Sequence, residues 1–206
     1  MPNWCKNHIE ISGPKAKVLE LLNLTLAGGL LKSVIPWPEE LAEIINRSGG
    51  KFINGRLTNC PNYYKEIDGK QIPVTDEDKN QLIKKYGTWE LYTWKKQNWG
   101  TGWTDDITSD INEVIAEITK NISTLNVTAK LDFVTGWTPP LKVYEKLLSE
   151  GFVVNANYYE RDNAYYGWFK DGQDHCFNIT GFKSIDPAIV KIFSIEPELV
   201  EDRAAN

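Results

Sequence analysis

The stretch VTAKLDFV, residues 127–134, constrains the fold more than any other part of the sequence. Its apolar residues stand at every second position from Val127 to Phe133 and alternate with polar ones, which is the period of a half-solvated strand. Strands with one buried face are typical of antiparallel sheets. We therefore expect a sheet that has one buried face and a second face free to be covered or used.

Patterns of strand and helix alternate on both sides of this stretch. The segment before it predicts a strand up to Gly13, a helix from Pro14 and a second strand over 30–36. After it, a helix begins at Pro139-Pro140 and three meandering strands follow within 152–180. This order is that of a split βαβ unit. The sequence therefore predicts an α+β, ferredoxin-like fold: an antiparallel sheet with helices on one face and a mainly helical or irregular insertion.

The polar stretch 47–74 interrupts the pattern and predicts an insertion with one hairpin. Its turn signals are Gly49-Gly50, Asn54-Gly55 and Asp68-Gly69. One helix is predicted to begin at Thr75 and to end at Gly87. A second is predicted to begin at Asp110, whose spacing to Glu113 is that of a capping box. We expect a single domain over 1–195 with the insertion at about 38–110, and a flexible acidic tail at 196–206.

Charge and composition exclude several classes of partner. A net charge of −5 disfavours polymeric nucleic acid and anionic membranes. The sequence contains no run of about 18 apolar residues, so we expect no transmembrane helix. The three cysteines include no Cys-x-x-Cys pair, and strand-like sequence begins almost at Met1, so we expect a protein of the host-cell cytoplasm with reduced thiols.

The residues that commonly carry catalysis form no convincing set. His8 and His175 lack the hydroxyl residue two positions later that two-histidine phosphoesterases need, and a nucleophilic Cys5 or Cys176 is separated from a histidine by strand geometry. Asp76 begins an imperfect calcium-loop pattern that is better explained as a helix N-terminus. We therefore predict no catalytic residues, no metal and no cofactor, and lean against an enzyme without excluding one.

The tetrapeptide Thr-Gly-Trp-Thr occurs twice, at 101–104 and 135–138, in a chain with eight tryptophans and nine tyrosines. The two copies have different flanks, which argues against a structural repeat. We expect both turns to converge on one cleft where flat rings meet polar tips, although each ring could instead be core. With Asn3 and Trp4 from the N-terminal motif, the predicted ligand-binding residues are Asn3, Trp4, Trp99, Thr101, Trp103, Asp105, Thr135, Trp137, Tyr159, Glu160 and Tyr166.

Four motifs resemble the YubB-type, ferredoxin-like proteins of bacteriophages and plasmids. They are MPNWC at 1–5, WGTGW at 99–103, FVTGWTPP at 133–140 and YYE at 158–160 with Gly167. The sequence departs from the family pattern in both turns. Gly102-Trp103-Thr104 stands where the family has Lys-Trp-Asp, so a basic and an acidic side chain are missing from the first turn, and Gly136-Trp137-Thr138 stands where the family has Ala-Trp-Ser. The resemblance implies a fold and a mobile-element setting; it implies no chemistry, because the family is largely uncharacterised.

Three functions remain open. The first is non-enzymatic binding of a small nucleotide-like ligand, as a counter-defence sponge that sequesters a nucleotide-derived immune signal. The alternative is a protein inhibitor that binds a host defence enzyme through aromatic anchors. The third is an acid/base hydrolase acting on a nucleotide through Glu160, Asp105 or Asp106. A homo-oligomer is compatible with all three.

Overall fold

The computed structural model describes residues 3–47, 51–53, 56–58, 62–120 and 123–197. They belong to two compact units. The first unit is formed by residues 1–36 and 98–206, and the second by Trp37–Gln97. The second unit lies within the insertion expected at 38–110, while residues 98–110 belong to the first unit.

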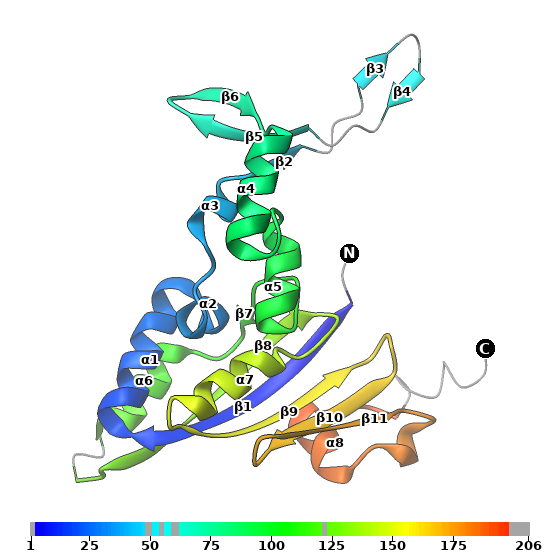
Figure 1. Cartoon of the computed structure of the whole chain (residues 1–206). Helices are drawn as coiled ribbons and strands as arrows, with labels where there is room; N and C mark the ends of the chain where they lie inside the picture. The colour runs from blue at the N-terminus through cyan, green and yellow to red at the C-terminus, as the bar shows by residue number, and fades with distance from the viewer. Residues whose placement is uncertain (1–2, 48–50, 54–55, 59–61, 121–122, 198–206) are drawn as a thin grey trace. The chain divides into compact units, whose positions relative to one another are not determined.

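A six-stranded sheet forms the first unit, with the order β11-β10-β9-β1-β8-β7 (Figure 1). Every neighbouring pair in it is antiparallel. The strands are β1 (Trp4–Pro14), β7 (Asp106–Ile107), β8 (Asn126–Gly136), β9 (Val153–Glu160), β10 (Tyr165–Lys170) and β11 (Gln173–Asn178). The helices are α1 (Lys15–Gly28), α2 (Leu30–Val34), α6 (Ile111–Lys120), α7 (Leu141–Ser149) and α8 (Pro187–Phe193), with a 3₁₀ turn at Phe182–Ser184. The mixed α+β architecture with an antiparallel sheet is as predicted.

The two faces of the sheet differ in polarity. On β1, alternate residues from Cys5 to Ile11 are fully buried, and they face the side on which α1 and α7 pack. The residues between them are polar and remain partly or fully exposed on what we call the open face. On β8 the pattern expected for 127–134 is confirmed, since Leu131 and Phe133 are buried. Hydrophobic burial on one side therefore fixes the register of the central strands.

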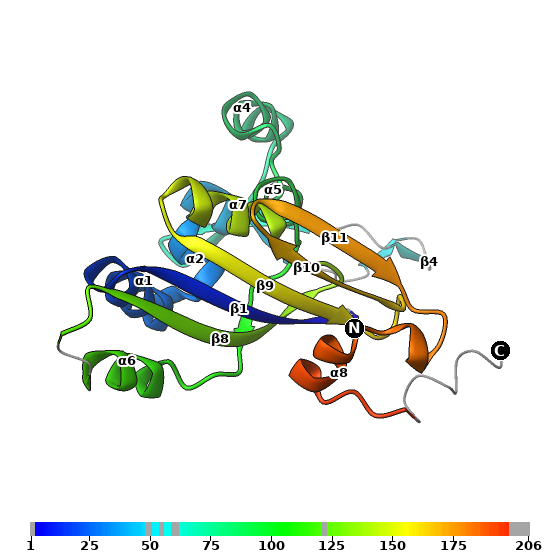
Figure 2. The same cartoon turned by 90° about the horizontal axis from the view of Figure 1, so that it is seen from below.

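One end of the open face is covered by the segment around α8 (Figure 2). Tyr159 and Tyr166 point to this face and pack against three isoleucines, and we call this group the C-terminal cluster: Tyr159, Tyr166, Ile185, Ile189 and Ile195. Helices were expected on one face only, so this helix on the second face is a correction. The residues at its start are typical of a helix N-terminus. The Asp186 side chain accepts a hydrogen bond from Ala188 N, and Pro187 is the first helical residue.

The strand predicted over 30–36 is wrong, because Leu30–Val34 is the helix α2. Gly29, with φ +84°, ends α1 and turns the chain. The next helix then starts on a cap from far along the chain: the Asp105 carboxylate accepts hydrogen bonds from the N–H groups of Leu30 at 2.7 Å and Leu31 at 3.4 Å. Because the capping residue lies 75 positions away in the sequence, no local pattern indicates that a helix begins at Leu30.

The second unit contains short strands and the helices α3, α4 and most of α5. A three-stranded sheet has the order β2-β5-β6, and β3 pairs with β4. The elements are α3 (Glu39–Ala42), β2 (Ile45–Arg47), β3 (Lys51–Ile53), β4 (Arg56–Thr58), β5 (Asn62–Ile67), β6 (Lys70–Pro73), α4 (Asp76–Tyr86) and α5 (Leu91–Trp99), the last of which ends in the first unit. The predicted hairpin is confirmed at Asp68-Gly69, whereas Gly49-Gly50 and Asn54-Gly55 lie outside the described residues.

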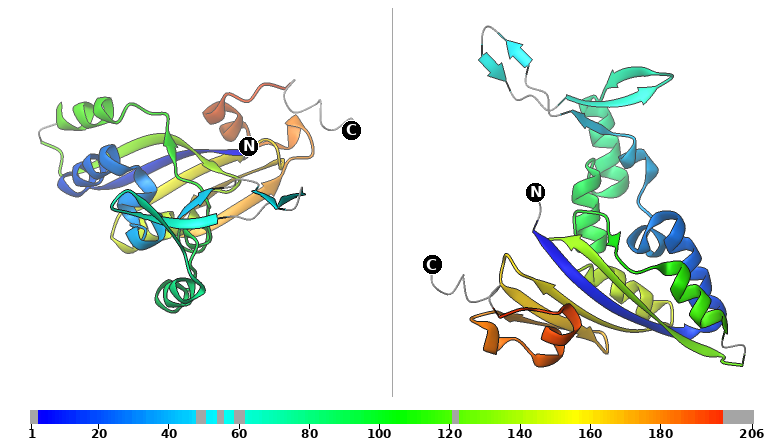
Figure 3. Two further views of the ribbon diagram at one scale, coloured as in Figure 1. Left: turned by 90° about the horizontal axis from the view of Figure 1, so that it is seen from above. Right: turned by 180° about the vertical axis from the view of Figure 1, so that it is seen from behind.

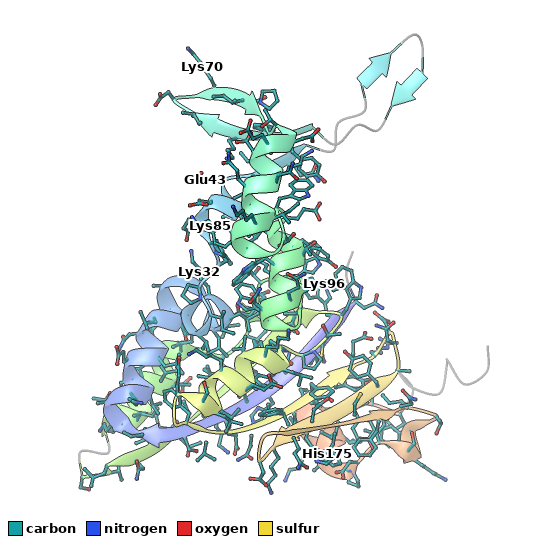
Figure 4. The ribbon with its side chains drawn as sticks, viewed as in Figure 1. Lys32, Glu43, Lys70, Lys85, Lys96 and His175 are labelled. Carbon is teal, nitrogen blue, oxygen red and sulfur yellow. The ribbon has the colours of Figure 1, made fainter. Side chains whose placement is uncertain are left out.

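Local sequence signals account for the helix α4 and its neighbours. Thr75 and Asp78 form a reciprocal capping box, and Gly87 ends the helix in the left-handed conformation. Lys85 of this helix forms an ion pair with Glu40 of α3 at 2.6 Å; Lys85 is labelled in Figure 4.

Over the part of the chain that the structure describes, no helix is both long and apolar enough to cross a membrane.

Candidate functional site

The two Thr-Gly-Trp-Thr turns lie against each other and exchange hydrogen bonds. The Thr101 hydroxyl donates to the carbonyl of Gly136 at 2.9 Å, and the Thr138 hydroxyl donates to the carbonyl of Gly100 at 2.8 Å. The indoles that follow also meet: the ring centroids of Trp103 and Trp137 are 5.9 Å apart and nearly edge to face. The predicted convergence of the two turns is therefore confirmed.

Backbone geometry holds the second turn in a fixed shape. Trp137 adopts a positive φ of 63°, its N–H donates to the carbonyl of Asn3 at 2.8 Å, and its own carbonyl accepts from the Tyr165 hydroxyl. Gly136 is required because a Cβ there would lie 2.5 Å from Trp103 Cδ1. The first indole therefore rests directly on the backbone of β8.

Together with Trp4, these rings form an exposed aromatic area, which we call the indole surface: Trp4, Trp103 and Trp137. Trp4 is paired with Gly136 across β1 and β8, and therefore stands on the strand next to the one that Trp103 covers. Trp4 is 46% exposed and Trp103 is 42% exposed, while Trp137 is half-buried. Large exposed aromatics gathered in this way are typical of binding sites.

The polar groups predicted to line this site are buried and already bonded within the protein. The Thr135 side chain is 0% exposed, and Thr101 is 1% exposed. A continuous chain of donors runs from the Tyr144 hydroxyl to Asn7, from Asn7 to the Thr135 hydroxyl at 3.0 Å, and from Thr135 to the Thr138 carbonyl at 2.8 Å. These hydroxyls position the turns, and they are not displayed toward a ligand.

Trp99 and Glu160 are likewise internal. Trp99 is completely buried, and its indole N–H donates to the carbonyl of Ile35 at 2.8 Å. The Glu160 carboxylate is also completely buried and accepts hydrogen bonds from the N–H groups of Asp162 at 2.7 Å and Asn163 at 2.5 Å. Glu160 thus closes the turn between β9 and β10.

The remaining predicted residues divide between the indole surface and other places. Asn3 borders the surface and contacts Asn163 through its side-chain amide at 3.5 Å. Tyr159 and Tyr166 instead belong to the C-terminal cluster, where the Tyr166 hydroxyl donates to the carbonyl of Ser184. Tyr165 was not predicted, although its hydroxyl holds Trp137. Its role depends on β10 folding back beside β9, which no local pattern reveals.

Asp105 lies next to the first turn but points to α2. A Cβ on Gly29 would lie 2.9 Å from its Oδ1, so the carboxylate fits closely over the backbone. Burial raises the pKa of this carboxyl, and the N–H groups of Leu30 and Leu31 oppose that rise. The group is a distant helix cap, which explains why an aspartate follows the turn.

Substituting Asp105 has a predictable effect on stability. Because the pKa is raised in the folded state, the contribution of this group is fully present below its unfolded pKa and is lost as the pH rises through the folded value. The difference in unfolding free energy between the wild type and Asp105→Asn is therefore expected to shrink as the pH rises above the ordinary pKa of an aspartate. Asp105→Ala should cost about 1 kcal/mol at pH 7 through loss of the cap. Urea unfolding at several pH values measures both, and a difference that grows with pH contradicts the assignment.

The reactive groups near the turns are poorly placed for chemistry. Cys5 is completely buried, and burial raises the pKa of its thiol to about 12, so the thiolate is scarce at neutral pH. Within the described ranges, no three His, Cys, Asp or Glu side chains are grouped so as to hold a metal ion. The site therefore presents flat apolar rings and not a set of reactive groups.

These features define the class of the protein as an α+β protein with an exposed aromatic surface. The chain matches no family model, no curated protein and no solved structure. The resemblance to the YubB-type family consequently remains a prediction.

Proposed function

We propose that the protein is a non-enzymatic binding protein that docks another protein through the indole surface. One observation carries this proposal: adjoining indoles stay exposed on a base whose polar groups are satisfied internally. Exposed tryptophans on a fixed backbone lose little entropy on binding and are enriched among the residues that dominate interface energies. The surface is therefore suited to act as an anchor for a partner.

A partner protein fits this surface better than a small ligand does. A small-ligand site combines apolar walls with a few polar groups that fix orientation. Here the expected polar groups, Thr101, Thr135 and Glu160, are turned into the protein. What is left on the outside is mainly apolar area, which a protein surface of complementary shape can cover.

The acid/base hypothesis finds little support at this place. Both oxygens of Glu160 accept backbone N–H groups, and both oxygens of Asp105 contact α2. A general base must instead reach a proton on its substrate. Asp106 is exposed, but the neighbouring carboxylate of Asp105 is engaged by the N–H groups of α2.

A capture experiment with matched variants tests the docking proposal. The tagged protein is incubated with lysate of the host, and bound protein is quantified for the wild type, Trp103→Ala and Trp4→Ala. Each variant is expected to lose at least about tenfold in capture of a stoichiometric partner, because hot-spot residues contribute about 2 kcal/mol or more. Tyr92→Ala removes an aromatic that is 45% exposed in the second unit and serves as the control. Equal capture by all variants, or no stoichiometric partner, refutes the proposal.

The biological setting of this binding activity is also a proposal. The motifs shared with the YubB-type family support a phage or plasmid protein that acts in the host cytoplasm, and the partner would then be a host defence enzyme. The competing sponge hypothesis, in which the protein sequesters a nucleotide-derived immune signal, requires polar groups that a ligand can reach. The polar residues predicted to contact such a ligand, Thr101, Thr135 and Glu160, are buried in this structure.

We also propose that the core of the first unit is a ferredoxin-like split βαβ unit. In support, its strands β9-β1-β8-β7 have the expected antiparallel order, with α1 after β1 and α7 between β8 and β9. The additions to this pattern are α2 and the second unit between α1 and β7, α6 between β7 and β8, and β10, β11 and α8 after β9.

A further inference from the structure

A groove of about 380 Å³ lies on the open face beside α8. Its floor is formed by β1, β9 and β10, and one wall is formed by Ala188 and Ile189 of α8. Figure 3 shows this helix beside the strands from behind. The volume is at the lower end of the range for small-molecule sites. The polar residues of the lining are Glu10, Asn155, Asn157, Lys170 and Asp186, and Trp168 and Phe169 are its aromatic residues.

The strand register places a row of polar and aromatic side chains across the open face, of which Asn157 and Trp168 line this groove. His8 pairs with Asn157, Asn157 pairs with Trp168, and Trp168 pairs with His175, so these four side chains form one row across the sheet. His175 is labelled on β11 in Figure 4. Asn155 is two residues from Asn157 on the same strand face, about 7 Å away along the strand. Two carboxamides therefore stand side by side next to an indole.

These amides are unusual because nothing in the described structure satisfies them. Both asparagines are half-buried, yet neither side chain has a hydrogen-bond partner among the described residues. Each amide offers two donors and one acceptor oxygen. Partial burial without protein partners reduces the hydrogen bonding of these amides with water. A ligand that pairs with the amides supplies the missing hydrogen bonds. The groove thus displays the polar groups that the indole surface lacks.

The charges of the groove are largely compensated. Glu10 forms an ion pair with Lys130 at 2.6 Å, and Asp186 accepts a hydrogen bond from Ala188 N. Lys170, at the rim, has no ion-pair partner among the residues described. A neutral ligand, or one with a single negative group near Lys170, is therefore compatible, whereas a cation would meet carboxylates that are already engaged.

Trp168 adds a rigid flat surface. Its ring packs against Phe177 with centroids 4.8 Å apart and against His175 at 5.8 Å, so the indole is held from the side of β11. Planar heterocycles stack on such rings, and the stacking contributes about 1–3 kcal/mol per base. Asparagine amides can pair with both a donor and an acceptor on the edge of a purine.

We infer that this groove binds the nucleobase of a free nucleoside or nucleoside monophosphate. Asn155 and Asn157 pair with the edge of the base, Trp168 supplies the stacking surface, and Lys170 meets a phosphate where one is present. The site is separate from the indole surface, and the inference does not rest on partner docking.

Calorimetric titration of the full chain with adenosine, guanosine, cytidine, uridine and their monophosphates tests the inference. Saturable one-site binding of at least one nucleoside is expected. Asn155→Ala and Asn157→Ala should each weaken it about tenfold, the equivalent of one hydrogen bond. Ala188→Tyr should abolish it by filling the groove. Lys170→Gln should remove any advantage of the monophosphate, and that advantage distinguishes a nucleotide from a nucleoside ligand.

Controls separate this site from the rest of the molecule. Asn80→Ala removes an exposed amide of α4, and Trp103→Ala alters the indole surface; both are expected to bind the nucleoside as the wild type does. Thermal unfolding verifies that the groove variants remain folded. The inference is overturned if no nucleoside or monophosphate binds saturably at about millimolar concentration. It is equally overturned if folded Ala188→Tyr and Asn157→Ala bind unchanged, or if glucose competes as well as a nucleoside. Loss of partner capture in Trp103→Ala with nucleoside binding retained leaves the inference standing.

Discussion

Gly167→Ala is expected to lower the unfolding free energy by about 3 kcal/mol or more, the upper range for overpacking a core. Gly167 lies in β10, and a Cβ there would collide with the backbone carbonyl oxygen of His175 and with the phenol of Tyr158. The carbonyl cannot move without disturbing the pairing of β10 and β11, and the phenol is held by a hydrogen bond to Asp174 at 2.7 Å. Neither the His175 carbonyl nor the Tyr158 phenol can move aside without a cost in free energy.

Thermal unfolding measures this effect. For a chain of this size, about 3 kcal/mol corresponds to a fall in melting temperature of roughly 6–12 °C. Gly28→Ala is the matched control, because a Cβ at the end of α1 meets only the flexible Lys32 side chain at 3.7 Å. That variant should be neutral or slightly stabilising. A Gly167→Ala protein that melts with the wild type would show that Tyr158 does not cross the strand at this point.

Glu160→Ala is expected to have the second largest effect, a loss of about 3 kcal/mol. The substitution leaves the N–H groups of Asp162 and Asn163 without their acceptor at a completely buried position. Each unsatisfied donor costs about 1–3 kcal/mol. The turn between β9 and β10 should loosen, and with it the support that Tyr165 gives to Trp137.

Two readouts distinguish this role from a chemical one. Chemical denaturation gives the loss of stability, and hydrogen exchange at residues 161–164 should accelerate in the variant. Glu145→Ala, on the exposed side of α7, should change neither readout. If Glu160→Ala kept wild-type stability and turn protection, the carboxylate would not be the structural closure described above, and a ligand-directed role would have to be reconsidered.

Periodic local signals were enough to predict much of the fold. The alternation at 127–134, the glycine stops and the caps at Thr75 and Asp110 correspond to real elements. Long-range effects produced the errors. The helix α2 depends on a carboxylate 75 residues away, and the segment 30–36 has no decisive period of its own. The sequence could not show that α8 would return to cover one end of the open face.

The candidate site was predicted in position but not in composition. The two Thr-Gly-Trp-Thr turns were expected to converge, and Trp103 and Trp137 do lie together. Motif spacing could not tell which groups would face outward, because the burial of Thr101, Thr135 and Glu160 depends on hydrogen bonds between distant segments. Asn155 and Asn157 were visible as alternate residues of a strand. Their significance appears only when the register places them beside Trp168.

The hydrogen bond between Trp99 and Ile35 has a consequence for how such a chain can evolve. Ile35 precedes the second unit and Trp99 follows it, so one contact of 2.8 Å ties together the two ends of the chain from which Trp37–Gln97 departs. With both ends held by the first unit, a change in the intervening length costs only a small increment of closure entropy. The second unit is thus a cassette that can be lengthened, shortened or exchanged between lineages while the sheet and both of its surfaces are preserved.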